Sequence, residues 1–183
     1  MRPTRRPPAD SPLGRLLATL PRPGRIEWIG LRPARDVPMH EVEAVAAVVG
    51  AGLDGDRYRG TSGARDVSLV QAEHLPVVAT LAGLPRLEPA RLRRNLVVSG
   101  IPLAALRGRR FRIGDDVVLE GTGPCDPCSR MELALGRGGY NAMRGHGGLV
   151  ARIVATGVIR VGDAVRPVDD APVPSDVAQH ALF

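Results

Sequence analysis

Lysine is absent from this sequence, aromatic residues are scarce and there are only two cysteines. All 25 basic residues are therefore arginine. Aromatic side chains make up 3% of the chain, so its core has to be built mainly from Val, Leu, Ile and Ala. A disulfide-stabilised secreted domain would need more cysteines than Cys125 and Cys128, spread along the chain. We therefore expect a protein of a reducing compartment, the cytoplasm.

Long apolar stretches are missing as well. No run approaches the roughly 20 apolar residues that span a bilayer as a helix. The N-terminus is rich in arginine and proline and lacks the apolar centre of a secretory signal. The sequence therefore predicts neither a membrane span nor a membrane partner.

The formal net charge of +6 would suit a nucleic-acid-binding protein, but this charge is unevenly distributed. Residues 1–25 hold six arginines and one acidic residue, Asp10, which is a net charge of +5. Only +1 is left for the other 158 residues. Zinc-finger spacing, RNP motifs and basic helices with interleaved aromatic residues are all absent. The sequence therefore predicts no nucleic-acid partner.

The organisation of the chain indicates many short elements. Glycine (22 residues) and proline (17 residues) are plentiful, which favours tight turns. We expect a flexible leader over 1–24, a folded domain over 25–167 and a tail over 168–183. Strands are predicted over 25–31, 66–71, 95–99, 111–113, 117–119, 150–155 and 163–165, helices over 72–80, 89–92 and 129–136, a helical turn over 13–20, and a strand or short helix over 42–49.

These elements do not alternate as regular βαβ units, so a parallel sheet is not expected. The predicted fold is mainly β with flanking helices (α+β), a mixed and mostly antiparallel β-barrel.

Cys125-Asp126-Pro127-Cys128 is the sharpest local pattern, and it allows four interpretations. A structural zinc site normally needs four Cys or His ligands, and the histidines show no paired spacing. A thioredoxin-like redox pair has this spacing but belongs in a βαβ context, which the predicted hairpin before it does not provide. The other two interpretations are one soft thiolate ligand for a metal-centred cofactor and two inert, buried thiols. Spacing alone does not decide among them.

Three further segments offer polar groups, each with a plainer alternative. The glycine-rich stretch 52–60 permits close approach to a phosphate or forms a surface turn. Arg93-Arg94-Asn95 offers guanidinium groups for a phosphate and an amide for a heterocycle edge, or is an ordinary solvated start to a strand. In the segment 143–148, His146 lines a pocket and titrates near neutrality, or is simply exposed.

Taken in order, these segments resemble the MOSC family, the domain found at the C-terminus of molybdenum-cofactor sulfurases and in stand-alone bacterial proteins. The resemblance spans about residues 25–167 and rests on the ordered set rather than on any one motif. The matching segments are 52–57 (GLDGDR), 68–73 (SLVQAE), 93–100 (RRNLVVSG), 106–108 (LRG), 111–115 (FRIGD), 123–128 (GPCDPC), 147–148 (GG), 151–152 (AR) and 161–163 (VGD).

The resemblance implies a MOSC-type mixed β-barrel that binds a molybdenum cofactor (molybdopterin). It places the molybdenum-ligating, catalytic thiolate at Cys128 and gives Cys125 a secondary role. It also implies that a pterin and phosphate pocket is formed by five residues. These are Arg57, Arg93, Asn95, Ser129 and Arg130.

The function implied by the resemblance is a molybdenum-dependent reductase of N-hydroxylated compounds. Such an enzyme would need an external electron-donor protein, because the chain has too few cysteines for an iron–sulfur cluster and no room for a flavin domain. A non-catalytic carrier of the cofactor, or of persulfide sulfur on Cys128, is the alternative. A thiol–disulfide oxidoreductase comes third. Pyridoxal phosphate is associated with the family only because full sulfurases carry an additional domain that binds it. The sequence does not indicate the oligomeric state.

Overall fold

The computed structural model describes residues 7–8, 10–58 and 63–168. The end of the glycine-rich stretch at Gly60, the first part of the predicted leader and the predicted tail beyond Val168 lie outside the described residues. The strands are β1 (Gly24–Leu31), β2 (His40–Glu41), β3 (Ala44–Val48), β4 (Gly52–Leu53), β5 (Val67–Gln71), β6 (Leu96–Ser99), β7 (Arg110–Ile113), β8 (Val117–Pro124), β9 (Leu149–Ala155), β10 (Gly157–Arg160) and β11 (Ala164–Pro167). The helices are α1 (Pro12–Ala18), α2 (His74–Leu81), α3 (Pro89–Leu92), α4 (Ser129–Leu135), α5 (Gly139–Ala142) and the 3-10 helix η1 (Leu103–Leu106).

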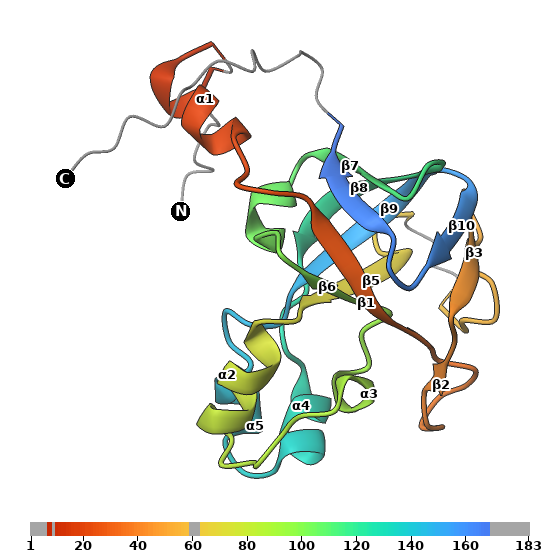
Figure 1. Cartoon of the computed structure of the whole chain (residues 1–183). Helices are drawn as coiled ribbons and strands as arrows, with labels where there is room; N and C mark the ends of the chain where they lie inside the picture. The colour runs from red at the N-terminus through yellow and green to blue at the C-terminus, as the bar shows by residue number, and fades with distance from the viewer. Residues whose placement is uncertain (1–6, 9, 59–62, 169–183) are drawn as a thin grey trace.

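Seven of the described strands form a closed barrel in the order β11-β7-β8-β9-β5-β6-β1 (Figure 1). The barrel closes because β1 also pairs with β11, antiparallel, with Gly24 opposite Val165. β5 and β6 run parallel, and the other neighbouring barrel strands run antiparallel. The predicted mixed, mostly antiparallel barrel is therefore confirmed.

A small second sheet, β10-β3-β4, lies beside the barrel. It decides between the two structures that the sequence allowed for 42–49. β3 is a strand because it pairs with β10, with Ala47 opposite Gly157. Five elements were not predicted from the sequence, namely β10, the two-residue strands β2 and β4, η1 and α5. Two-residue strands are too short to show any periodicity.

The core has two parts, which share β5 and β6 as a wall. Leu69 and Leu96 point into the barrel and belong to its interior cluster. Val70 and Val97 point to the other side, where they join the cluster beneath the helices. Since both faces are covered, these two strands are almost continuously apolar, as buried parallel strands are. The alternation along each strand therefore assigns its side chains to two different cores.

The helices α2, α3, α4 and α5 gather at one end of the barrel, whereas α1 lies at the opposite end (Figure 1). α4 begins directly after Cys128, and Met131 and Leu135 bury its inner face. The Glu132 carboxylate accepts hydrogen bonds from the backbone N–H groups of Gly138 (2.7 Å) and Tyr140 (2.9 Å), which joins α4 to α5. The end of β8 and the start of α4 thus place the Cys-x-x-Cys segment between the barrel and the helices.

Within the described residues, no helix combines the length and the apolar character needed to cross a membrane.

Gly148 is the position where the backbone leaves the least room, and it generates a test of the fold. Its φ is +91°, and a Cβ there would lie 1.9 Å from the carbonyl oxygen of Leu69 on β5. We expect Gly148→Ala to lower the free energy of unfolding by about 3 kcal/mol or more, because conformational strain and a backbone clash add. Equilibrium unfolding in urea measures this change.

Gly50→Ala is the matched control. Gly50 also has a positive φ, +74°, but a Cβ there would meet nothing within 4 Å. In Gly50→Ala, backbone strain alone should lower the free energy of unfolding by about 1 kcal/mol. Equal losses in the two variants would contradict the close approach of the 147–148 loop to β5.

Candidate functional site: an arginine-lined pocket beside Cys128

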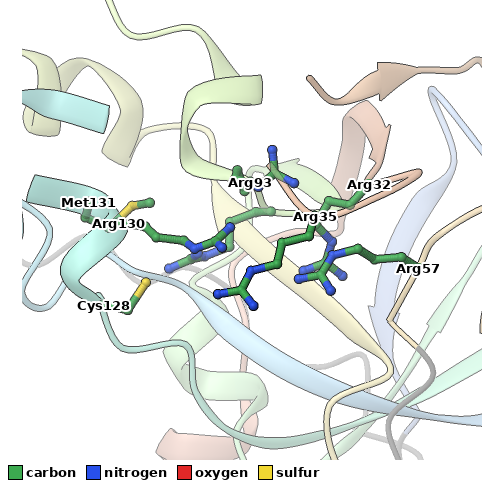
Figure 2. A pocket seen from close by; sticks show the side chains of 8 residues that line it. Arg32, Arg35, Arg57, Arg93, Cys128, Arg130 and Met131 are labelled. Atoms are coloured by element: carbon green, nitrogen blue, oxygen red, sulfur yellow. The ribbon is translucent and has the colours of Figure 1, made fainter. Parts of the chain in front are cut away.

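Four segments that are far apart in the sequence meet around a pocket of about 300 Å³. They are the loop after β1, the turn after β4, the link between α3 and β6, and the start of α4. The lining residues are Arg32, Arg35, Arg57, Arg93, Arg94, Cys128, Arg130 and Met131 (Figure 2). Six of these eight side chains are guanidinium groups, so the pocket is suited to an anionic ligand.

Arg32 is held in place by a buried carboxylate, that of Asp56, which is 3% exposed. Nε of Arg32 donates to Oδ2 of Asp56 at 3.0 Å, and Nη2 donates to Oδ1 at 2.9 Å. The backbone N–H of Arg32 adds a third bond at 2.9 Å. Burial raises the pKa of Asp56, but the bonds from Arg32 outweigh burial and hold this pKa below its ordinary value. Asp56 is therefore ionised at neutral pH and fixes the direction of the guanidinium.

Asn95 lies behind this ion pair and is 0% exposed. Its Oδ1 accepts from the Ser68 hydroxyl at 2.8 Å and from Nη2 of Arg32 at 3.0 Å. Its Nδ2 donates to Asp56 at 2.8 Å and to the Gly30 carbonyl at 3.1 Å. Both amide atoms are fully used inside the protein. The expectation that Asn95 pairs with a heterocycle edge therefore needs correction, because this side chain positions Arg32 and Asp56 instead.

Arg94 is a buried cation, 7% exposed, that is solvated by backbone carbonyl groups. It donates from Nη1 to Leu92 and from Nε to Gly147, both at 3.0 Å, and from Nη2 to Cys125 at 3.3 Å. None of the ion pairs found among the described residues involves it. Arg94 thus ties the cysteine segment to α3 and to the loop before β9, and its charge is not cancelled by a carboxylate.

Arg93 has a left-handed backbone, with φ +54°, and its Nη1 donates to the carbonyl of Val37 at 2.7 Å. Burial lowers the pKa of this guanidinium. Three neighbouring groups of the same charge, Arg130, Arg32 and Arg57, lower it further. Like charges are therefore crowded in the pocket, which is the electrostatic condition for binding an anion.

The remaining arginines, Arg35, Arg57 and Arg130, form what we term the rim. Arg35 and Arg57 are exposed, and the Arg130 side chain is 33% exposed. The Asp36 carboxylate contacts two of them, with Oδ1 at 3.0 Å from Nη2 of Arg130 and Oδ2 at 3.5 Å from Nε of Arg35. No ion pair joins Arg57 to another of the described residues.

The two cysteines have different environments. Cys125 is buried, and its backbone N–H donates to the carbonyl of Gly148 at 2.9 Å. Cys128 is exposed, lines the pocket and immediately precedes α4. Both thiols are free. Cys128 therefore offers a soft sulfur ligand toward a cavity whose other polar groups are cations.

Of the residues predicted for the site, Cys128, Arg57, Arg93 and Arg130 line the pocket. Ser129 is exposed and is not among the lining residues. Arg32 and Arg35 were not predicted, because they follow the first predicted strand in an Arg-Pro-Ala-Arg segment that matches no binding motif. Only their proximity in space to the cysteine segment reveals them.

His146, which the sequence offered as a pocket residue, packs against His74 instead. The two rings meet edge to face with centroids 4.8 Å apart. Burial lowers the pKa of His74, and the neighbouring His146 adds to this. Within the described part of the chain, no group of three or more His, Cys, Asp or Glu side chains could hold a metal ion, and His180 lies outside that part.

The sequence profile of the MOSC domain matches residues 54–166 of the chain. The fold is similar to that of the YuaD protein from Bacillus subtilis, with a TM-score of 0.68 and 21% identity over 79% of this chain and 94% of that one. It is also similar to YiiM from Escherichia coli (TM-score 0.62, 18% identity, 80% of this chain and 71% of that one). YiiM from Geobacillus stearothermophilus gives a TM-score of 0.65 at 17% identity, over 80% of this chain and 76% of that one. No curated protein matches the chain significantly.

The Arg32–Asp56 pair generates a prediction about acid stability. We expect Asp56→Asn to lower the free energy of unfolding at neutral pH by about 3 kcal/mol, because Arg32 loses its buried partner. The pKa of Asp56 is lower in the folded than in the unfolded chain, so the unfolded chain takes up the proton first as the pH falls. The difference in free energy of unfolding between the wild type and Asp56→Asn should therefore shrink progressively below about pH 4. Urea unfolding over a pH series measures this difference.

Asp54→Asn is the matched control, since Asp54 is two residues away and exposed. Its side chain has no hydrogen bond or ion pair to a described residue. We expect a stability close to that of the wild type at each pH. A difference in free energy of unfolding between the wild type and Asp56→Asn that stays constant down to pH 2 would contradict the lowered pKa of Asp56 in the folded chain.

Proposed function

The chain belongs to the MOSC domain family, and from that premise we propose that its arginine-lined pocket binds a molybdenum cofactor (molybdopterin) with Cys128 as the metal ligand. The observation that carries the proposal is the exposed, free thiol of Cys128 in a pocket otherwise lined largely by guanidinium groups. A thiolate is a suitable protein ligand for molybdenum, and arginine is the natural partner of the cofactor's phosphate.

The residues present fit such a group in charge and in donor type. Arg94 supports this most directly, because it is a buried cation with carbonyl partners alone among the described residues. Arg93, whose charge interacts with that of the neighbouring Arg130, would bind the anionic part of the cofactor. Asp56 and Asn95 keep Arg32 oriented without touching the ligand. Arg94 also positions the segment that carries the thiol, through the carbonyl of Cys125.

For the reaction, we favour reduction of an N-hydroxylated compound. The N–O bond breaks, an N–H bond forms, and the oxygen leaves as water, which consumes two electrons and two protons. When bound, the molybdenum supplies a two-electron centre that accepts oxygen. We propose that the electrons come from an external electron-donor protein, because this sequence has two cysteines and most iron–sulfur clusters are held by four. The chain's own part is to bind the cofactor, orient it and keep the pocket cationic.

The exposure of Cys128 also supports a second candidate, a carrier that binds and passes on the cofactor, or a persulfide sulfur, without turnover. Both candidates require a free thiol, and a reducing compartment such as the cytoplasm would maintain it. They differ in whether an added electron donor gives turnover of an N-hydroxylated compound.

The first test is the metal content of protein purified from molybdate-fed cells, measured by mass spectrometry. We expect about one molybdenum per chain in the wild type and a loss of at least tenfold in Cys128→Ala, because the only proposed protein ligand is removed.

Cys125→Ala is the control, since it removes the neighbouring thiol, which is buried in the wall. It should retain molybdenum, and circular dichroism should show that both variants are folded. Zinc or no metal in the wild type, despite an adequate supply of cofactor, would overturn the proposal.

A further inference from the structure

The six arginines of the pocket fall into two groups that differ in how firmly they are held. Arg32, Arg93 and Arg94 each donate to acceptors of the protein, and we term them the fixed arginines. The rim arginines Arg35 and Arg130 have one exposed carboxylate, Asp36, between them as their ion-pair partner. The fixed group is preorganised for a ligand that stays, whereas the rim is free to change partners.

Asp36 occupies the place that an anionic ligand group would take at the rim. Each of its two carboxylate oxygens faces a different arginine, at 3.0 Å from Arg130 and 3.5 Å from Arg35. Its side chain is 70% exposed, and exposed ion pairs contribute little to stability, so a competing anion displaces it easily. The backbone of Asp36 is also left-handed, with φ +61°, which is an unfavourable conformation for a residue with a side chain.

The rim lies beside the thiol that the proposed function uses. Arg130 comes two residues after Cys128, at the start of α4. Figure 2 shows the Arg35 side chain extending across the pocket toward the side that holds Cys128 and Arg130. An anion bound between these two arginines would hold the rest of its molecule close to Cys128.

The pocket also has more positive charge than one phosphate balances. Six guanidinium groups line it, and Asp36 and Asp56 are the carboxylates that pair with them among the described residues. The excess is four positive charges. A phosphate monoester carries about two negative charges, so one bound phosphate leaves positive charge in the pocket for a second anion.

We propose that Arg35 and Arg130 recognise a carboxylate or phosphate on the substrate, which displaces the Asp36 carboxylate. This inference rests on the proposed function, and it specifies the substrate as an anionic N-hydroxylated compound. Asp36 then weakens the binding of every anion at the rim, so its removal is expected to strengthen such binding.

The test compares adenosine 5′-monophosphate with adenosine, which share a planar amine-bearing base and differ in the phosphate. Binding to the purified protein is measured by titration calorimetry at low salt, where exposed charges are least screened. We expect the wild type to prefer the phosphorylated compound. Asp36→Asn should bind it roughly threefold more tightly and Arg35→Gln roughly threefold more weakly, with adenosine unchanged in both.

Glu120→Gln is the matched control, because it removes one carboxylate from another ion pair, that with Arg152 at 2.9 Å. It should leave the preference unchanged. Equal binding of the two compounds by the wild type, or no effect of Asp36→Asn, would overturn the proposal. So would an effect of Glu120→Gln as large as that of Asp36→Asn, because net charge would then explain both.

The molybdenum content of the same samples separates the two sources of phosphate. If Arg35→Gln loses molybdenum as well as affinity for adenosine 5′-monophosphate, the rim binds the phosphate of the cofactor and the proposal is overturned. An unchanged molybdenum content together with a weaker affinity for adenosine 5′-monophosphate supports the proposal. A wild type without molybdenum would refute the proposed function. The ratio of the dissociation constants of adenosine and adenosine 5′-monophosphate would still decide whether the rim recognises an anion.

Discussion

Asp56 is a carboxylate with almost no contact with solvent, and the side of the pocket formed by Arg32 depends on it. It accepts hydrogen bonds from the side chain and backbone of Arg32, and one from the amide of Asn95. Asn95 in turn bonds Ser68 at the start of β5. Three barrel strands and the turn after β4 are thereby fixed relative to one another through polar groups. Each of these groups is costly to bury alone, and together they satisfy one another.

This network also explains how so many positive charges can share one cavity. Arg32 is neutralised by a buried acid, whereas Arg94 is stabilised by carbonyl dipoles that leave its full charge in place. Asp36 offsets part of the positive charge of the rim, and only at the surface, where water screens the contact. The pocket therefore has a permanent part with fixed geometry and an adjustable part at its mouth. Such a division suits a protein that retains one anionic ligand and exchanges another.

Most of the fold could be predicted from local pattern. The hairpin β7–β8 follows from apolar residues on both sides of Gly114-Asp115, and β6 follows from a β-branched run. Helix α3 begins with Pro89, where a missing N–H costs nothing. The segment 42–49 could not be decided, because β3 pairs along most of its length with β10, which lies about 110 residues further along the chain, and its nearer partner β4 has only two residues. Local sequence propensity cannot indicate a pairing partner that is so distant in the sequence.

The sequence by itself determined the chemistry available to this protein: arginine as its one cationic side chain apart from histidine, two cysteines with one spacing, and short strands that alternate well enough to form a barrel. Only the tertiary structure decided which of these groups meet. It moved Asn95 out of the predicted ligand contacts into a buried supporting position, brought in Arg32 and Arg35, and separated Cys125 from Cys128. The reason is physical. A side chain's role depends on its burial and its partners, and these are set by the closure of the barrel, which joins residues more than 100 positions apart.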